Sequence, residues 1–191
     1  MKYKIGVFGS AVVGELDSIT IKKAEELGTT LAKYKLTCIT GACSGLPYLA
    51  AYNARNNGAD VLGFSPEVDL KNQKKFTPTD DLTIYKNLIF IPKNFPLISD
   101  QQTRKKYRNV ISTSNCDAGI IISGRWGTLN EFTNLYDMGK VIGILTGTGG
   151  IADEIENLNK KIFKKSKAKI IFNNSPTELV KKVIAELELR N

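Results

Sequence analysis

The residues best suited to chemistry lie in the segment Ser123–Glu131, which reads SGRWGTLNE. Gly124 and Gly127 permit a close approach of the backbone to a ligand, and the amides that open a helix favour an anion such as phosphate. Glu131 follows one helical turn later, where its carboxylate could face the sugar of a nucleotide. The spacing from Thr128 to Glu131 is also that of a capping box, in which Glu131 only caps the helix. Spacing alone leaves both interpretations open.

The chain has 191 residues and no histidine. This excludes Ser-His-Asp and Cys-His nucleophile systems, histidine-ligated zinc or haem, and imidazole acid–base chemistry. Catalysis would depend on carboxylates, Lys or Arg, hydroxyls, thiols and backbone amides. Cys38, Cys43 and Cys116 show no CxxC spacing. We interpret them as reduced thiols and expect no metal site. Cys43 differs from the other two because it lies in a glycine-rich turn.

The elements that must position these residues alternate between strand and helix. Apolar residues three and four apart predict the helices, and short apolar runs predict the strands. This order requires βαβ crossovers and hence a parallel sheet. The expected strands are 5–8, 36–40, 61–65, 88–91, 118–122, 141–145 and 169–172, and the expected helices are 18–34, 46–57, 99–114, 128–138, 151–163 and 175–189. The sequence therefore predicts one doubly wound, Rossmann-like α/β domain over residues 1–191, with a six- or seven-stranded parallel sheet flanked by helices.

Ligands of such sheets bind at the carboxyl ends of the strands, near the switch in strand order. Four glycine-bearing turns are expected there, at 9–10, 41–45, 124–127 and 147–150. The last also fits a dinucleotide pattern, but no Asp or Glu closes the strand that follows it, so NAD is not expected. The segment 67–96 is expected to be a loop over the sheet edge that carries one strand. Its length predicts a functional flap.

The chain resembles the LOG family of lysine decarboxylase-like Rossmann proteins, which are associated with cytokinin riboside 5′-monophosphate phosphoribohydrolase activity. The family signature PGGxGTxxE is matched by Ser123–Glu131, and its early Gly-Ser turn by Gly9-Ser10. Its TGGxxGLM-type turn is matched by Thr40–Leu46. The similarity runs in register over residues 4–146, and the turn at 147–153 resembles a bacterial and archaeal subgroup of poorly defined activity.

The resemblance implies that Arg108 and Glu131 are the catalytic pair. It also implies that residues of the glycine-bearing turns bind substrate and phosphate: Gly9, Ser10, Gly41, Ser44, Gly45, Gly124, Arg125, Gly127 and Thr128. The implied reaction hydrolyses the N-glycosidic bond of a nucleoside 5′-monophosphate, without a cofactor. A carboxylate suits this reaction because it stabilises an oxocarbenium-like state or activates the attacking water. A guanidinium can hold the phosphate or the ribose. Decarboxylation is not expected, because no pyridoxal phosphate site is recognisable.

Departures from the family pattern leave an alternative open. The signature's proline is Ser123 and its second glycine is Arg125, and the motif that carries Arg108 continues with Asn109 in place of the usual lysine. The alternative is a non-catalytic carrier or sensor of a nucleotide-like cofactor, similar to the molybdenum-cofactor carriers of related fold.

The net charge of +8, from 27 Lys and Arg against 19 Asp and Glu, raises nucleic-acid binding as a third hypothesis. The lysines are dispersed, only one Trp is available for base stacking, and no nucleic-acid motif is present, so nucleic acid is not an expected partner. Three of the four cations in 104–108 are expected on a solvated helix face. Without a long apolar stretch or a signal peptide, the protein is expected to be cytoplasmic, with no membrane partner. The resemblance implies a homo-oligomer, most often a dimer.

Overall fold

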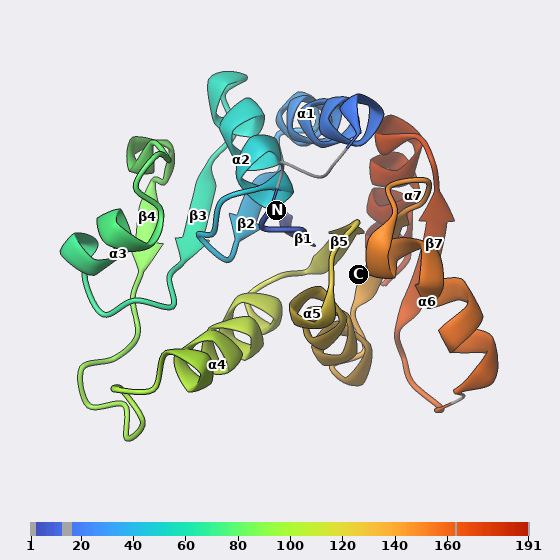
Figure 1. Ribbon diagram of the computed structural model, residues 1–191. Coiled ribbons are helices and arrows are strands. Elements are labelled where there is room, and N and C mark those ends of the chain that lie inside the picture. The colour runs from blue at the N-terminus through green and yellow to red at the C-terminus, as the bar shows by residue number, and fades with distance from the viewer. Residues whose placement is uncertain (1–2, 13–16, 163, 191) are drawn as a thin grey trace.

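The computed structural model describes residues 3–12, 17–162 and 164–190, which form a parallel sheet between two layers of helices (Figure 1). The strands are β1 (Lys4–Gly9), β2 (Thr37–Thr40), β3 (Val61–Phe64), β4 (Asn87–Ile89), β5 (Ala118–Ile122), β6 (Val141–Leu145) and β7 (Lys169–Asn173). Their order in the sheet is β4-β3-β2-β1-β5-β6-β7, and every neighbouring pair is parallel. The predicted fold class is confirmed, with the larger of the two expected strand numbers.

The helices cover both faces of the sheet. They are α1 (Ser18–Lys33), α2 (Leu46–Asn56), α3 (Leu70–Phe76), η1 (Leu82–Ile84), α4 (Gln101–Ser114), α5 (Trp126–Asp137), α6 (Gly150–Lys161) and α7 (Pro176–Leu189). Helices α1, α2 and α7 pack on one face, and α4, α5 and α6 lie on the other (Figure 1). Each face has its own apolar cluster. Strands β5 and β6 are buried along their whole length, as expected for strands covered on both sides.

Close packing of α1 on α2 depends on a glycine. A Cβ at Gly28 would lie 2.1 Å from the carbonyl oxygen of Ala50. Only a residue without a side chain allows the two helices to approach this closely. Helix α2 is thereby held against the sheet, with its first residue directly after the turn 41–45.

The flap is more regular than the sequence predicts. Its polar run contains α3, which begins where the Asp69 side chain accepts a hydrogen bond from the Asn72 amide at 2.8 Å. The prediction of a loop there was wrong because the buried residue of α3 is polar. Gln73 bonds to Ser65 at 2.6 Å, to Thr77 at 2.9 Å and to a backbone carbonyl at 3.0 Å. The expected strand is present as β4.

The order of the strands reverses between β1 and β5. From β1 the chain runs outward through β2, β3 and β4, and it then returns to the other side of β1 as β5. The loops after β1 and β5 therefore diverge over opposite faces, and a crevice forms where they separate. Among the described residues, no helix combines the length and the apolar character needed to cross a bilayer.

Candidate functional site

A cavity of about 270 Å³ opens at this switch point, between the carboxyl ends of β1 and β2 and the helices α4 and α5. It joins segments that are far apart in the sequence. The predicted site residues that line it are Gly9, Gly41, Ser44, Arg108, Gly127, Thr128 and Glu131. The structure places both members of the predicted catalytic pair at one cavity.

Glu131 lies in the second turn of α5 and is 7% exposed. Helix α5 begins at Trp126, two residues before the expected start, and its N-cap is Arg125. Thr128 is therefore inside the first turn and cannot be the N-cap, so the capping-box interpretation of Glu131 was wrong. Burial raises the pKa of Glu131 to about 7, against the lowering influence of Arg108 and Lys106. Both protonation states of this carboxyl are populated near neutral pH.

Arg108 projects from α4 and is 8% exposed. Its Nη1 donates to the carbonyl oxygen of Gly41. A Cβ at Gly41 would lie 1.5 Å from that nitrogen, so residue 41 must be glycine for the guanidinium to fit. Burial opposes the positive charge, but Cys43 and Glu131 outweigh this effect and raise the pKa of Arg108. The guanidinium is thus a permanent cation inside the cavity wall.

The N-terminus of α5 has no side-chain cap. The first amides of a helix have no partner within the helix, and the helix dipole adds partial positive charge there. Gly127 and Thr128 bring this end of the helix to the cavity, and Lys105 and Lys106 of α4 line the same space. An anionic group therefore finds both charge and hydrogen-bond donors here.

The structure places Ser10, Gly45, Gly124 and Arg125 outside the lining of the cavity. The carbonyl of Ser10 accepts from the amide of Leu46 at 2.9 Å, and a Cβ at Gly45 would lie 2.2 Å from that same oxygen. These two residues join the loop after β1 to the start of α2.

Gly124 instead meets the start of α6. Its carbonyl accepts from the amide of Ile151 at 2.8 Å. The amides of Gly147 and Gly149 donate to the carboxylate of Asp153 at 2.7 and 2.8 Å. Asp153 thus occupies two of the four amides of this glycine-bearing turn, where an anionic ligand would otherwise bind.

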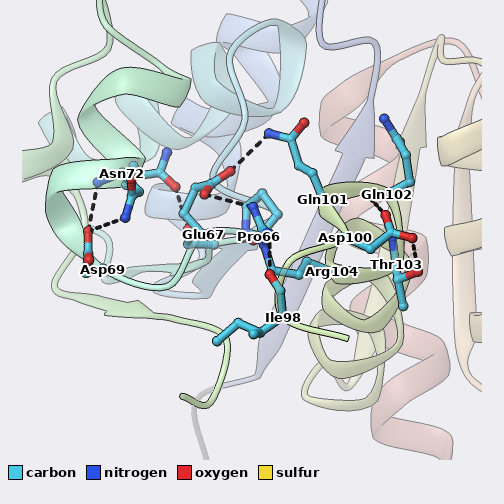
Figure 2. Close-up of polar contacts among 12 residues, drawn as sticks. Pro66, Glu67, Asp69, Asn72, Ile98, Asp100, Gln101, Gln102, Thr103 and Arg104 are labelled. Atoms are coloured by element: carbon cyan, nitrogen blue, oxygen red, sulfur yellow. Dashed lines mark hydrogen bonds and ion pairs between the residues drawn. The ribbon is translucent and has the colours of Figure 1, made fainter. Parts of the chain in front are cut away.

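Arg104 and Lys105, at the start of α4, contact the flap, contrary to the expectation of a solvated face, whereas Lys106 is exposed as expected. The guanidinium of Arg104 donates from Nε to the carbonyl of Pro66 at 2.9 Å and from Nη2 to the carboxylate of Glu67 at 3.2 Å. A third bond reaches the carbonyl of Ile98, as Figure 2 shows. Lys105 lies 5.5 Å from the ring centroid of Phe76 in α3. Helix α4 is thereby fastened to the flap beside the cavity.

Comparison with known proteins identifies the family. The SLOG cluster4 family model matches residues 2–180. The chain belongs to the SLOG cluster4 family. This is a LOG- and DprA-like Rossmann group of nucleotide-binding fold, in agreement with the resemblance seen in the sequence. Among curated proteins, no match is found.

Solved structures similar to this SLOG cluster4 protein share its fold at low identity. The structural genomics target TM1055 is 22% identical with a TM-score of 0.76, covering 97% of this chain and 99% of that chain. The molybdenum cofactor carrier protein MCP from Chlamydomonas reinhardtii is 17% identical with a TM-score of 0.66, and the match covers 98% of this chain and 99% of that chain. DNA processing protein A from Helicobacter pylori, described as binding single-stranded DNA, is 16% identical with a TM-score of 0.62. The match covers 97% of this chain and 80% of that chain. A DNA-binding protein thus has this fold, so the exclusion of nucleic acid as a partner is not supported.

The sequence analysis missed several residues of the cavity in the SLOG cluster4 protein. Gln102, Lys105, Lys106 and Asn109 line it from one side of α4. Their spacing of three and four residues was the available signal, because it puts them on one face of a helix. Polar residues with this spacing are also typical of a solvated face, so the pattern alone could not place them at a site.

The three cysteines are free thiols in different surroundings. Cys38 and Cys116 are buried, and burial raises the pKa of Cys38 to about 12. Cys43 is half-buried, lines the cavity, and lies with its Sγ 3.5 Å from the carbonyl oxygen of Gly41. Among the described residues, no group of three or more His, Cys, Asp or Glu could hold a metal ion.

Proposed function

We propose that this protein binds a nucleoside 5′-monophosphate and hydrolyses its N-glycosidic bond, releasing the base and ribose 5-phosphate. One observation carries the proposal. A buried carboxyl with a pKa of about 7, that of Glu131, lines the same switch-point cavity as the buried guanidinium of Arg108 and the uncapped start of α5.

The phosphate binds at the positive end of the cavity. The free amides at the start of α5 donate to its oxygens, and Lys105 and Lys106 balance its charge. Glu131 lies about one helical turn beyond Gly127 and lines the same cavity, so we assign it to the sugar of a nucleotide whose 5′-phosphate lies at the start of α5. Arg108 donates from Nη1 to the carbonyl of Gly41 and also interacts with the Cys43 side chain. Its Nε has no partner among the described residues, so we assign this N–H to the sugar or the phosphate.

The chemical step uses only water as a second reactant. The ionised carboxylate of Glu131 accepts a proton from a water molecule, whose oxygen forms a bond to C1′ of the ribose. The C1′–N bond breaks, and the base leaves with the electron pair and is then protonated. The carboxylate also stabilises the positive charge that develops on the sugar. A pKa of about 7 suits a general base at neutral pH, because a large fraction of the carboxyl is ionised while its basicity stays high.

The test is incubation of the purified protein with a panel of nucleoside monophosphates, followed by mass spectrometry. We expect ribose 5-phosphate and free base from the wild type and from Glu154→Gln, a control at an exposed carboxylate of α6. Glu131→Gln should retain the nucleotide and lose activity by about 100-fold or more, the usual contribution of a general base. Equal activity of Glu131→Gln and the wild type would refute the assigned role.

A non-catalytic carrier of a nucleotide-like cofactor is the second candidate function. It is supported by the likeness of fold over nearly the whole chain to the molybdenum cofactor carrier protein. The uncapped start of α5 and the two lysines serve a carrier equally well, since both act on the phosphate. Native mass spectrometry separates the two functions. A carrier retains its ligand intact, so neither the wild type nor Glu131→Gln would release a base.

A further inference from the structure

Two buried polar atoms on consecutive residues of α4 have no hydrogen-bond partner within the described part of the chain. They are Nε of Arg108 and Oδ1 of Asn109. Both residues line the cavity, and they are 8% and 4% exposed. Buried polar atoms are rarely left unpaired, because each has given up a hydrogen bond to water. Nδ2 of Asn134 in α5 is also unpaired, but Asn134 does not line the cavity. Arg108 and Asn109 do line it, so a ligand in the cavity can supply the acceptor and the donor that their unpaired atoms lack.

The orientation of the Asn109 amide follows from its other contacts. Its Nδ2 donates to Oδ1 of Asn130 at 3.0 Å and lies 3.5 Å from the carbonyl oxygen of Gly127. A backbone carbonyl can only accept a hydrogen bond, so the reversed amide would bring two oxygens together. Oδ1 is therefore the atom left over, and it requires a donor from the ligand.

A phosphate cannot be that donor, because its ionised oxygens only accept hydrogen bonds. The unpaired oxygen must therefore face another part of the nucleotide. Asn109 lies beside Gly127, in the first turn of α5, where the phosphate binds in the proposed function. In a nucleoside 5′-monophosphate the sugar is attached directly to the phosphate and the base lies beyond it. A sugar hydroxyl is therefore the donor group that reaches this position.

We infer that Asn109 is a specificity-determining residue that accepts a hydrogen bond from a ribose hydroxyl, so that the site selects ribonucleotides over deoxyribonucleotides. This inference rests on the proposed function and assigns the residue that recognises its ribose. A deoxynucleotide leaves Oδ1 of Asn109 buried and unpaired in the complex. Binding sites built to hydrogen-bond a hydroxyl discriminate strongly against analogues that lack it, for this reason.

The test compares the dissociation constants of adenosine 5′-monophosphate and its 2′-deoxy and 3′-deoxy analogues by native mass spectrometry, which also reveals any turnover. The comparison is repeated with the guanosine, cytidine and uridine series. For the wild type we expect one of the two deoxy analogues to bind about tenfold more weakly, or worse, than the ribonucleotide. In Asn109→Leu the ribonucleotide and the deoxynucleotides should bind alike.

Asn130→Ala is the matched control. Like Asn109→Leu, it removes the hydrogen bond between the side chains of Asn109 and Asn130, which joins α4 to α5. It keeps the acceptor oxygen of Asn109, so the discrimination between the sugars should remain. If circular dichroism shows Asn109→Leu to be unfolded, Asn109→Ser replaces it, because the serine side chain is too short to reach the sugar.

The outcomes separate this inference from the proposed function. Equal binding of all three sugars by the wild type overturns the inference and leaves the proposed function standing. Discrimination that persists in the Asn109 variants also overturns it, since another residue then reads the hydroxyl. The inference is also overturned if the wild type distinguishes nucleotides by their base but binds the ribose and deoxyribose forms of each alike. If the wild type binds no ribonucleotide of any series, the proposed function fails and the inference fails with it.

Discussion

Burial of the Glu131 carboxyl should make the stability of the protein depend on pH in a way that one substitution removes. In the folded chain its pKa is about 7, against an ordinary value of 4.5. Between these two values the unfolded chain is ionised at this residue while the folded chain holds the proton. The contribution of Glu131 to stability should therefore be most favourable below pH 4.5, fall as the pH rises, and reach its lower level above pH 7.

The size of the effect follows from the same two values. Each pKa unit corresponds to about 1.4 kcal/mol, so the difference between 4.5 and about 7 amounts to about 3.5 kcal/mol of stability lost well above neutral pH. Glu131→Gln has no charge to bury and should avoid this loss. The free energy of unfolding of the variant, relative to the wild type, should rise by about 3 kcal/mol between pH 4 and pH 8.5.

Urea denaturation at a series of pH values, followed by circular dichroism, measures this difference. Subtracting the wild type from the variant cancels the contributions of the other titrating groups, which are common to both chains. Glu154→Gln serves as the control, because it makes the same chemical change at an exposed side chain, where no charge is buried on folding. A difference between Glu131→Gln and the wild type that stays flat from pH 4 to pH 8.5 would refute the argument, since the carboxyl would then be as well solvated as in the unfolded chain.

Three further predictions concern the packing around the cavity. Gly41→Ala should displace the guanidinium of Arg108 and destabilise the protein by about 1–3 kcal/mol in thermal denaturation, because the new Cβ has no room; an unchanged melting temperature would contradict this. Arg104→Met should cost about 3–5 kcal/mol by leaving the carboxylate of Glu67 buried without its cation, and Glu67→Gln in the same chain should recover part of the loss. Cys43 should be the one thiol that reacts with N-ethylmaleimide in the native protein, and a bound nucleoside monophosphate should slow the reaction. Peptide mapping would identify the labelled cysteine. Rapid labelling of the two buried thiols would contradict the structure.

Local sequence patterns were sufficient for most elements of the fold. Strands 118–122 and 141–145 were predicted with their observed bounds, because an apolar run that is buried on both faces of a sheet ends where polar or turn residues begin. The start of α7 was equally clear. The side chain of Ser175 accepts from the amide of Glu178 at 3.3 Å, so this cap is made by residues three apart in the sequence.

The same cap pattern failed at α5, because the start of that helix is decided by distant residues. Ser123 and Gly124 both have positive φ, 52° and 100°. The amide of Ser123 donates to the Thr148 hydroxyl at 2.8 Å, and the carbonyl of Gly124 accepts from the first turn of α6. These contacts hold a left-handed turn that lets the helix begin at Trp126. A window of neighbouring residues contains none of this information.

The sequence by itself determined the fold class, the order of the elements, and the residue types at the site, Arg108 and Glu131 above all. These follow from the periodicity of apolar residues, from turn residues, and from the motifs shared with a family. Only the tertiary structure decided which glycine-bearing turns face the cavity, where Asn109 lies, and that the pKa of Glu131 is near neutral. Burial and the pairing of polar atoms depend on segments that meet only after folding, such as β2, α4 and α5, so no local pattern can encode them.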